Sequence, residues 1–234
     1  MGKYLIGNFV TEITAKYDRL ASLLKQFEYG GVRPAEIMLF VNDDMLQSIR
    51  SRMVKGSTLA QAEELAYATE FNRAIVDRGA MLIHSSALVY NGGAYLFSAK
   101  SGTGKSTHTR LWQQAFGDKV KIINDDKPIV RIKNNKCTVY GTPFDGGSNI
   151  AFNESAPLKA VIFIERGEEN SIRKASQAEI IANLYSSTVH ILSREKADAM
   201  LKNFDRLIKM CDFYILTCNT DISAAYTAYD ALIK

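Results

Sequence analysis

The clearest chemical feature of this sequence is a glycine-rich segment that ends in lysine and serine, within AYLFSAKSGTGKST at residues 94–107. An apolar run leads into it and a helix-compatible stretch follows, which is typical of a phosphate-binding loop (P-loop). Glycines let successive backbone N–H groups point at one anion, and the start of the helix adds further N–H groups. Lys105 would supply a cation for the β- and γ-phosphates, and the Ser106 hydroxyl a ligand for Mg²⁺. The predicted cofactor-binding residues are Ala99, Lys100, Ser101, Gly102, Thr103, Gly104, Lys105, Ser106 and Thr107.

Two details of the loop refine this prediction. Ala99 stands where the usual pattern begins with glycine, so the loop must begin in an ordinary backbone conformation. No [NT]-K-x-D motif follows the loop, which disfavours GTP and leaves ATP with Mg²⁺ as the expected cofactors. We expect Lys105 to face solvent before a nucleotide binds. The alternative is a Gly/Ser turn that happens to contain a lysine.

A second group of reactive side chains lies on both sides of the loop. Asp125 and Asp126 follow the apolar residues Ile122 and Ile123, and His84 precedes the loop. Phosphoryl transfer needs charge neutralisation and a group that orients and deprotonates a hydroxyl. Two carboxylates at the end of a strand beside the phosphates can share these tasks. The predicted catalytic residues are Asp125, Asp126, His84 and Lys105.

Each of these residues also has a purely structural interpretation. An aspartate pair is common in turns and helix caps, and a histidine beside a strand can be a buried, hydrogen-bonded residue. His108, in the first turn after the loop, is expected to be a solvated helix residue. Residues 141–144 (GTPF) would shape an acceptor pocket or form an ordinary turn.

Composition excludes several classes of protein. The 234 residues suffice for one domain, with residues 1–55 as an optional small N-terminal subdomain. The net charge is +4, but the lysines and arginines are not clustered in the sequence, so we expect no nucleic-acid partner. No apolar run reaches ~18 residues and the N-terminus lacks signal-peptide features, so we expect no membrane association. Three cysteines without C-x-x-C spacing indicate reduced thiols of a cytoplasmic protein.

Hydrophobic periodicity predicts the order of the elements. A strand at 3–10, a helix at 17–27 and a strand at 35–41 come first, and the helix at 58–78 has a capping-box start. A hairpin at 87–97 feeds the loop. The remaining predictions are a helix at 105–116, strands at 121–123, 128–133, 136–140, 159–165 and 213–216, and helices from 176, 193 and 221. This order favours an α/β fold with a mixed sheet and helices mainly in the C-terminal half.

The order of three motifs resembles the HPr kinase/phosphorylase family and the wider phosphoenolpyruvate-carboxykinase-type nucleotide fold. The motifs are Ile83-His84, the SGTGKS loop at 101–106 and Asn124-Asp125-Asp126. The resemblance covers roughly residues 80–165. It implies that Lys105 and Ser106 bind ATP and Mg²⁺, and that one aspartate is the general base while the other lies near the metal, with Ser106 and Asp126 taken as metal ligands. Which aspartate is the base stays open.

Departures from the family limit the expected function. The first loop glycine is replaced by Ala99, and neither the family's N-terminal domain nor its protein-substrate signature is recognisable. The prediction is therefore an ATP-dependent phosphotransferase acting on a hydroxyl, serine first, of a peptide, a protein or a small molecule other than HPr. The alternatives are a non-catalytic nucleotide-binding regulatory module and a carboxykinase-like enzyme acting on a small acid. The oligomeric state, a homo-oligomer included, stays open.

Overall fold

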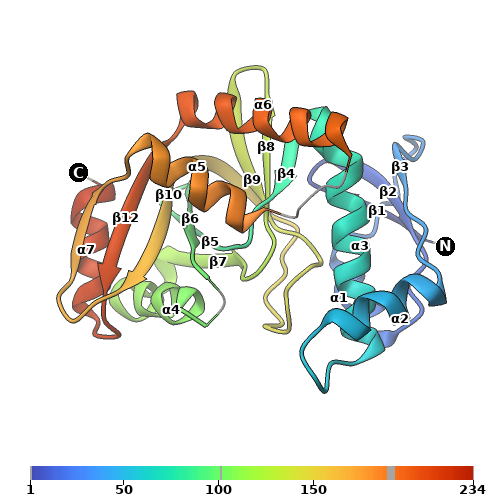
Figure 1. The fold of residues 1–234 in the computed structure, drawn as a ribbon, viewed down its shortest axis with the longest axis horizontal. Helices are drawn as coiled ribbons and strands as arrows, with labels where there is room; N and C mark the ends of the chain where they lie inside the picture. Colours follow the sequence, from blue (N-terminus) through green and yellow to red (C-terminus); the bar gives the residue numbers. More distant parts are fainter. Residues whose placement is uncertain (1, 101, 189–192, 234) are drawn as a thin grey trace.

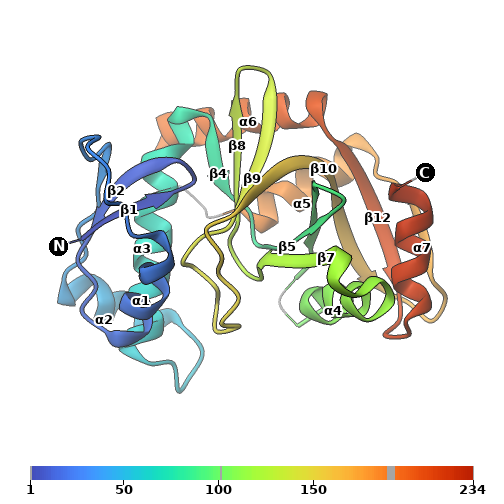
Figure 2. The ribbon, with the colours of Figure 1, turned by 180° about the vertical axis from the view of Figure 1, so that it is seen from behind.

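Figure 1 shows a computed structural model of the chain, which describes residues 2–100, 102–188 and 193–233. A large sheet runs through the middle, with helices on both of its faces. A smaller sheet lies beside the N-terminal helices (Figure 2). This is a mixed α/β fold, as the sequence predicts.

The large sheet has nine strands in the part of the chain that the structure describes. Its order is β4-β8-β9-β10-β6-β5-β7, and β12 pairs with both β10 and β11. β10 joins two regions, because its first residues pair antiparallel with β9 and its later residues pair parallel with β6 and β12. The strands are β4 (Ala80–Leu82), β5 (Ser85–Tyr90), β6 (Gly93–Ser98), β7 (Val120–Asn124), β8 (Ile129–Lys133), β9 (Lys136–Tyr140), β10 (Ser155–Arg166), β11 (Ser171–Lys174) and β12 (Asp212–Cys218).

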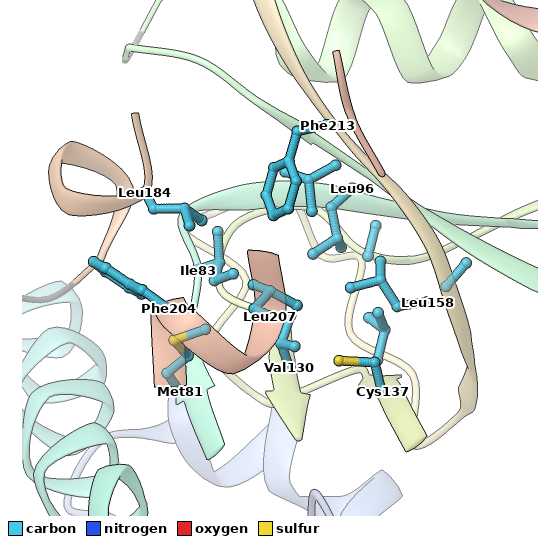
Figure 3. Packing of buried hydrophobic residues seen from close by; sticks show 14 of the residues in the cluster. Met81, Ile83, Leu96, Val130, Cys137, Leu158, Leu184, Phe204, Leu207 and Phe213 are labelled. Carbon is cyan, nitrogen blue, oxygen red and sulfur yellow. The ribbon is translucent and has the colours of Figure 1, made fainter. Parts of the chain in front are cut away.

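Alternating side chains give the large sheet a core on each face. Leu96 and Ile123 point into one core, where α5 (Gln177–Ser187) and α6 (Arg194–Met210) contribute Leu184, Phe204 and Leu207 (Figure 3). Phe97 and Ile122 point into the other core. There, α4 (Lys105–Phe116) and α7 (Ser223–Leu232) cover the sheet, and Trp112 is fully buried.

The prediction of a single N-terminal strand at 3–10 is wrong, because this segment belongs to a hairpin of two strands. β1 (Gly2–Ile6) and β2 (Phe9–Ile13) pair antiparallel around Gly7 and Asn8, whose φ angles are 58° and 63°. Two residues with positive φ form the tight turn that fits the twist of a hairpin. The strand predicted at 35–41 shrinks to β3 (Ile37–Met38), which completes the small sheet. That residues 1–55 fold as a subdomain stays a prediction.

The helices are distributed differently from the expectation. Besides α1 (Asp18–Leu24) and α3 (Leu59–Ile75), the N-terminal part contains α2 (Asp43–Arg52), which the sequence analysis missed. Asn42 caps α2 by accepting a hydrogen bond from the Met45 amide. Four of the seven α-helices in the described residues therefore begin before residue 117, and the expectation of helices mainly in the C-terminal half is wrong. Short 3-10 turns lie at Lys25–Phe27, Val76–Arg78 and Gly117–Lys119.

Two further features bear on the sequence analysis. Among the described residues, no helix is both long and apolar enough to cross a membrane. All three cysteines, Cys137, Cys211 and Cys218, are free thiols.

Candidate functional site at one edge of the large sheet

The three predicted motifs meet at one edge of the large sheet. β6 and β7 both run antiparallel to β5, so their carboxyl ends lie at the edge where β5 begins. The glycine-rich loop follows β6, the aspartate pair follows β7, and His84 comes just before β5. Strand pairing therefore brings together His84, Lys105 and Asp126, each of which is 21 positions from the next in the sequence. It does so because the carboxyl ends of β6 and β7 lie on the same side of the sheet.

The glycine-rich loop leads directly into α4. Gly102 and Gly104 have φ angles of 77° and 126°, conformations that favour glycine, and Gly104 is the N-cap of the helix. Ala99 is not among the non-glycine residues with positive φ, as its side chain requires. Ser101 lies outside the described residues. Lys100, Gly102 and Thr107 are exposed, whereas Thr103, Gly104 and Ser106 are half-buried.

Arg166, at the end of β10, holds the loop from the neighbouring strand. Its guanidinium donates hydrogen bonds to the carbonyl oxygen of Thr103, at 3.2 Å, and to that of Gly102. From the sequence, Arg166 was one of three arginines, with Arg131 and Arg173, that were left open as a source of a cation for the transition state. The signal was its place at the end of an apolar strand, the same signal that marks Asp125 and Asp126.

Lys105 does not face solvent, contrary to the expectation. As the first residue of α4 it is only 9% exposed, and its Nζ lies 3.1 Å from Nε2 of His84. Burial lowers the pKa of Lys105, and the nearby carboxylates of Asp126 and Asp125 act in the opposite direction. The Lys105 ammonium thus lies at the carboxyl ends of the strands, close to the other residues that were predicted to be catalytic.

Asp126 lies on the other side of His84. Its Oδ1 is 3.1 Å from His84 Nε2, and its Oδ2 pairs with the ammonium of Lys127. Burial raises the pKa of Asp126, but the hydrogen bond from His84 and the charge of Lys127 outweigh it and hold that pKa at about 2. The carboxylate is therefore ionised at neutral pH.

Asp125 points to a different place. It is 7% exposed and accepts a hydrogen bond from Ser86 Oγ, which lies 3.1 Å from Thr109 Oγ1. Thr109 belongs to α4 and its hydroxyl also reaches the carbonyl oxygens of Lys105 and Ser106. Asp125 is thus linked through two hydroxyls to the first turn of the helix that carries Lys105.

A buried asparagine shapes the turn that carries both aspartates. Asn124 Oδ1 accepts hydrogen bonds from the backbone N–H groups of Asp126 and Lys127, at 3.1 and 2.8 Å. Its Nδ2 donates to the carbonyl oxygen of Thr142, at 3.0 Å, and the Thr142 hydroxyl donates to the carbonyl oxygen of Lys127, at 2.8 Å. Residues 141–144 therefore support the aspartate turn. Lys127 was missed as a site residue, whereas Asn124 belongs to the predicted motif and residues 141–144 were predicted to shape an acceptor pocket or to form an ordinary turn.

Gly146 packs directly against the Asp126 carboxylate. A Cβ at this position would lie 2.7 Å from Asp126 Oδ2, and the φ angle of 62° also favours glycine. Glu64 on α3 holds Gly146 in place, because its Oε1 accepts a hydrogen bond from the Gly146 amide at 2.8 Å. Glu64 was not predicted, since the contact joins residues far apart in the sequence.

Several cavities in the described part of the chain border the site. One of about 320 Å³ lies beside the glycine-rich loop, between Thr103, Thr107, Arg166 and Asn219. Another of about 220 Å³, which we call the Asp126 cavity, is lined by Met53, Gln61, Glu64, Leu65, Asp126, Lys127 and Gly146. The loop and the aspartate turn therefore each have open space beside them.

His108 is buried, so its expected place in solvent is wrong. It is 2% exposed, packs against Phe97, and accepts a hydrogen bond from Trp112 Nε1 at 3.1 Å. Burial lowers the pKa of His108 to about 4. It belongs to the core beneath α4 and takes no part in the cluster around His84.

The comparisons with known proteins give little beyond the fold. No family model matches the sequence, and no curated protein matches it. One similar solved structure is the Hpr(Ser) kinase/phosphatase from Coxiella burnetii, with 10% identity and a TM-score of 0.38 over 65% of this chain and 96% of that chain. Similarity at this level is a distant likeness of fold and carries no functional information.

Proposed function

We propose that this protein is an ATP-dependent phosphotransferase that transfers the γ-phosphoryl group to a hydroxyl. The observation that carries the proposal is the row formed by Lys105, His84 and Asp126, in which His84 Nε2 is 3.1 Å from both Lys105 Nζ and Asp126 Oδ1. A cation at the end of a glycine-rich loop and a carboxylate close to it are two charges that phosphoryl transfer uses.

The residues have distinct roles in this proposal. Backbone N–H groups of the loop and of the α4 start bind the phosphates, and Lys105 neutralises charge on them. The ionised Asp126 carboxylate accepts a hydrogen bond from the attacking hydroxyl and then its proton. His84 Nε2 can hydrogen-bond to only one neighbour in each tautomer, so it positions either Asp126 or Lys105 at a time. Asp125 fixes the start of α4 through Ser86 and Thr109.

The donor set fits Mg²⁺. This ion takes one or two protein oxygens and completes its shell with water and phosphate oxygens. Ser106 Oγ has no hydrogen bond to any other described residue, and Asp126 is ionised at neutral pH. Ser106 would hold the ion, which would supply charge neutralisation to the phosphates when bound, and the negative charge of Asp126 would favour an ion nearby. The described residues contain no group of three or more acidic, histidine or cysteine ligands for another kind of metal site.

The test is transfer of phosphate from ATP, followed by mass spectrometry with serine, serine-containing peptides and small polyols as acceptors. We expect transfer with Mg²⁺ and none with EDTA. ATP binding without transfer to any acceptor would favour the regulatory module, whereas absence of nucleotide binding would refute the proposal.

A further inference from the structure

The Asp126 carboxylate has one side toward the glycine-rich loop and one side away from it. Oδ1 is turned to His84 and, beyond it, to Lys105. Oδ2 is turned to Lys127 and to Gly146, and both of these residues line the Asp126 cavity. The loop itself lines other cavities, beside Arg166. Nucleotide phosphates bound to the loop would therefore lie on the Oδ1 side of Asp126. The Asp126 cavity, on the Oδ2 side, would stay open to a second substrate.

The N-terminal region builds the far wall of this cavity. Met53 and three residues of the first half of α3 lie opposite Asp126 and Lys127. Glu64 anchors the wall, because its Oε1 accepts from the Gly146 amide and its Oε2 accepts from Arg19 Nε at 3.0 Å. Arg19 also pairs with Asp145, next to Gly146. These contacts link α1 and α3 to the turn at Asp145 and Gly146, and Gly146 in turn packs against Asp126.

A second cavity adjoins the first. It measures about 360 Å³, it shares Met53 with the Asp126 cavity, and it lies at the end of α2 and the connection to α3. Its lining residues are Gln47, Arg50, Ser51, Met53, Val54, Lys55, Gly56 and Ser57. A small hydroxyl compound would fill only the Asp126 cavity. An extended chain could occupy both, with one residue at Asp126 and its neighbours along the end of α2.

The second cavity is basic. Arg50 and Lys55 both line it, and among the described residues neither of them forms an ion pair. Arg50 Nε donates to the carbonyl oxygen of Ser57, at 3.1 Å, which holds the loop while leaving the other guanidinium N–H groups free. Val54 adds an apolar side chain that is 84% exposed. Unpaired cations beside an exposed apolar side chain suit a chain with acidic residues.

We infer that the two cavities form one docking groove for an acidic peptide segment that carries the accepting hydroxyl. This inference rests on the proposed function. The acidic residues of the segment pair with Arg50 and Lys55, and its hydroxyl residue enters the Asp126 cavity. There, the hydroxyl oxygen forms a bond to the γ-phosphorus of ATP, the bond from that phosphorus to ADP breaks, and the hydroxyl proton passes to Asp126.

The first experiment measures binding alone. Val54→Cys, labelled with an environment-sensitive fluorophore, is titrated with a pool of twelve-residue peptides that contain one serine among glutamate, glycine and leucine. The native thiols are poor competitors for the label, since burial raises the pKa of Cys137 and Cys218 to about 11 and also raises the pKa of the half-buried Cys211. We expect saturable binding that weakens with salt, and at least tenfold weaker binding of a matched lysine pool. Equal binding of both pools would overturn the inference.

A charge-reversal pair then tests the groove itself. Arg50→Glu with Lys55→Glu should weaken binding of the acidic pool about tenfold or more, while ATP binding stays unchanged. The matched control is Lys133→Glu with Lys136→Glu, exposed residues at the β8–β9 turn with the same change in charge. If both double variants lose peptide binding equally, the effect is one of net charge and the groove is refuted.

Transfer assays separate this inference from the proposed function. Phosphorylated peptide from the acidic pool, lost in the Arg50/Lys55 variant, would support both. Transfer only to free serine or polyols, with no peptide bound, would keep the phosphotransferase and refute the groove. Peptide binding in the groove without any transfer would refute the phosphotransferase and leave a peptide-binding surface.

Discussion

Asp125 and Asp126 are neighbours in the sequence, but their carboxylates serve opposite sides of the turn. Asp125 accepts a hydrogen bond from Ser86 beneath α4, whereas Asp126 lies between His84 and Lys127. The resemblance to kinases could not tell which of the two is the base. The structure gives them different surroundings, and these lead to different expectations for each residue.

Asparagine at each position should separate the two roles. Asp126→Asn removes the charge and the proton acceptor that face His84, so we expect phosphate transfer to fall at least 10²-fold while ATP still binds. Asp125→Asn keeps an oxygen that can accept from Ser86, so its turnover should stay within about tenfold of wild type. The measurement is transfer to the best acceptor alongside ATP titration. The reverse ranking would move the base to Asp125.

Lys105→Met should strongly reduce turnover of the nucleotide without loss of the fold. Methionine can fill the buried space of the lysine stem but carries no charge for the phosphates. We expect turnover to fall on the order of 10²-fold or more and the melting temperature to stay the same or rise, because a buried cation is removed. Lys119→Met, exposed after α4, serves as the control. Full activity of Lys105→Met would contradict the phosphate-loop assignment.

The sequence predicted the parts of the site that depend on local pattern. The glycine-rich loop, the first turn of α4 and the aspartates after β7 lie where hydrophobic periodicity and motif spacing indicate. Such features are local, because a strand end or a helix start is determined by a few adjacent residues.

The remaining parts depend on contacts between distant residues. Lys105 is buried and contacts His84, which strand pairing brings to it from 21 positions away. The link from Glu64 to Gly146 spans 82 positions, and no local pattern marks either residue. The β1–β2 hairpin is different. Its signal was present, since Gly7 and Asn8 are two residues that tolerate positive φ and lie between apolar runs.

Stability should fall in mild acid because of His108. Its pKa is about 4 in the folded protein, against 6.5 for an unperturbed histidine, so the unfolded chain binds the proton first as the pH falls. The contribution of neutral His108 to the free energy of unfolding is fully present above pH 6.5. It declines by up to about 1.4 kcal/mol per pH unit as the pH falls toward 4. His108→Gln, which keeps an acceptor for Trp112, should show a shallower decline. Urea unfolding followed by fluorescence of the single tryptophan, Trp112, measures both. Parallel pH profiles would exclude His108 as the cause.

Gly146→Ala should damage the site more than the fold. The added methyl group would lie 2.7 Å from Asp126 Oδ2, so either the carboxylate or the Gly146 turn must move. A shift of about 1 Å in a catalytic group can lower turnover about 10²-fold. Alanine at positive φ also destabilises the fold by roughly 1–2 kcal/mol. Gly147→Ala separates these effects, since Gly147 has a φ of 105° but no atom within 4 Å of the place where its methyl group would lie. We expect both variants to melt at lower temperature and only Gly146→Ala to lose transfer by more than tenfold. If Gly147→Ala loses as much activity as Gly146→Ala, the backbone of the turn determines the effect, and the contact with Asp126 does not.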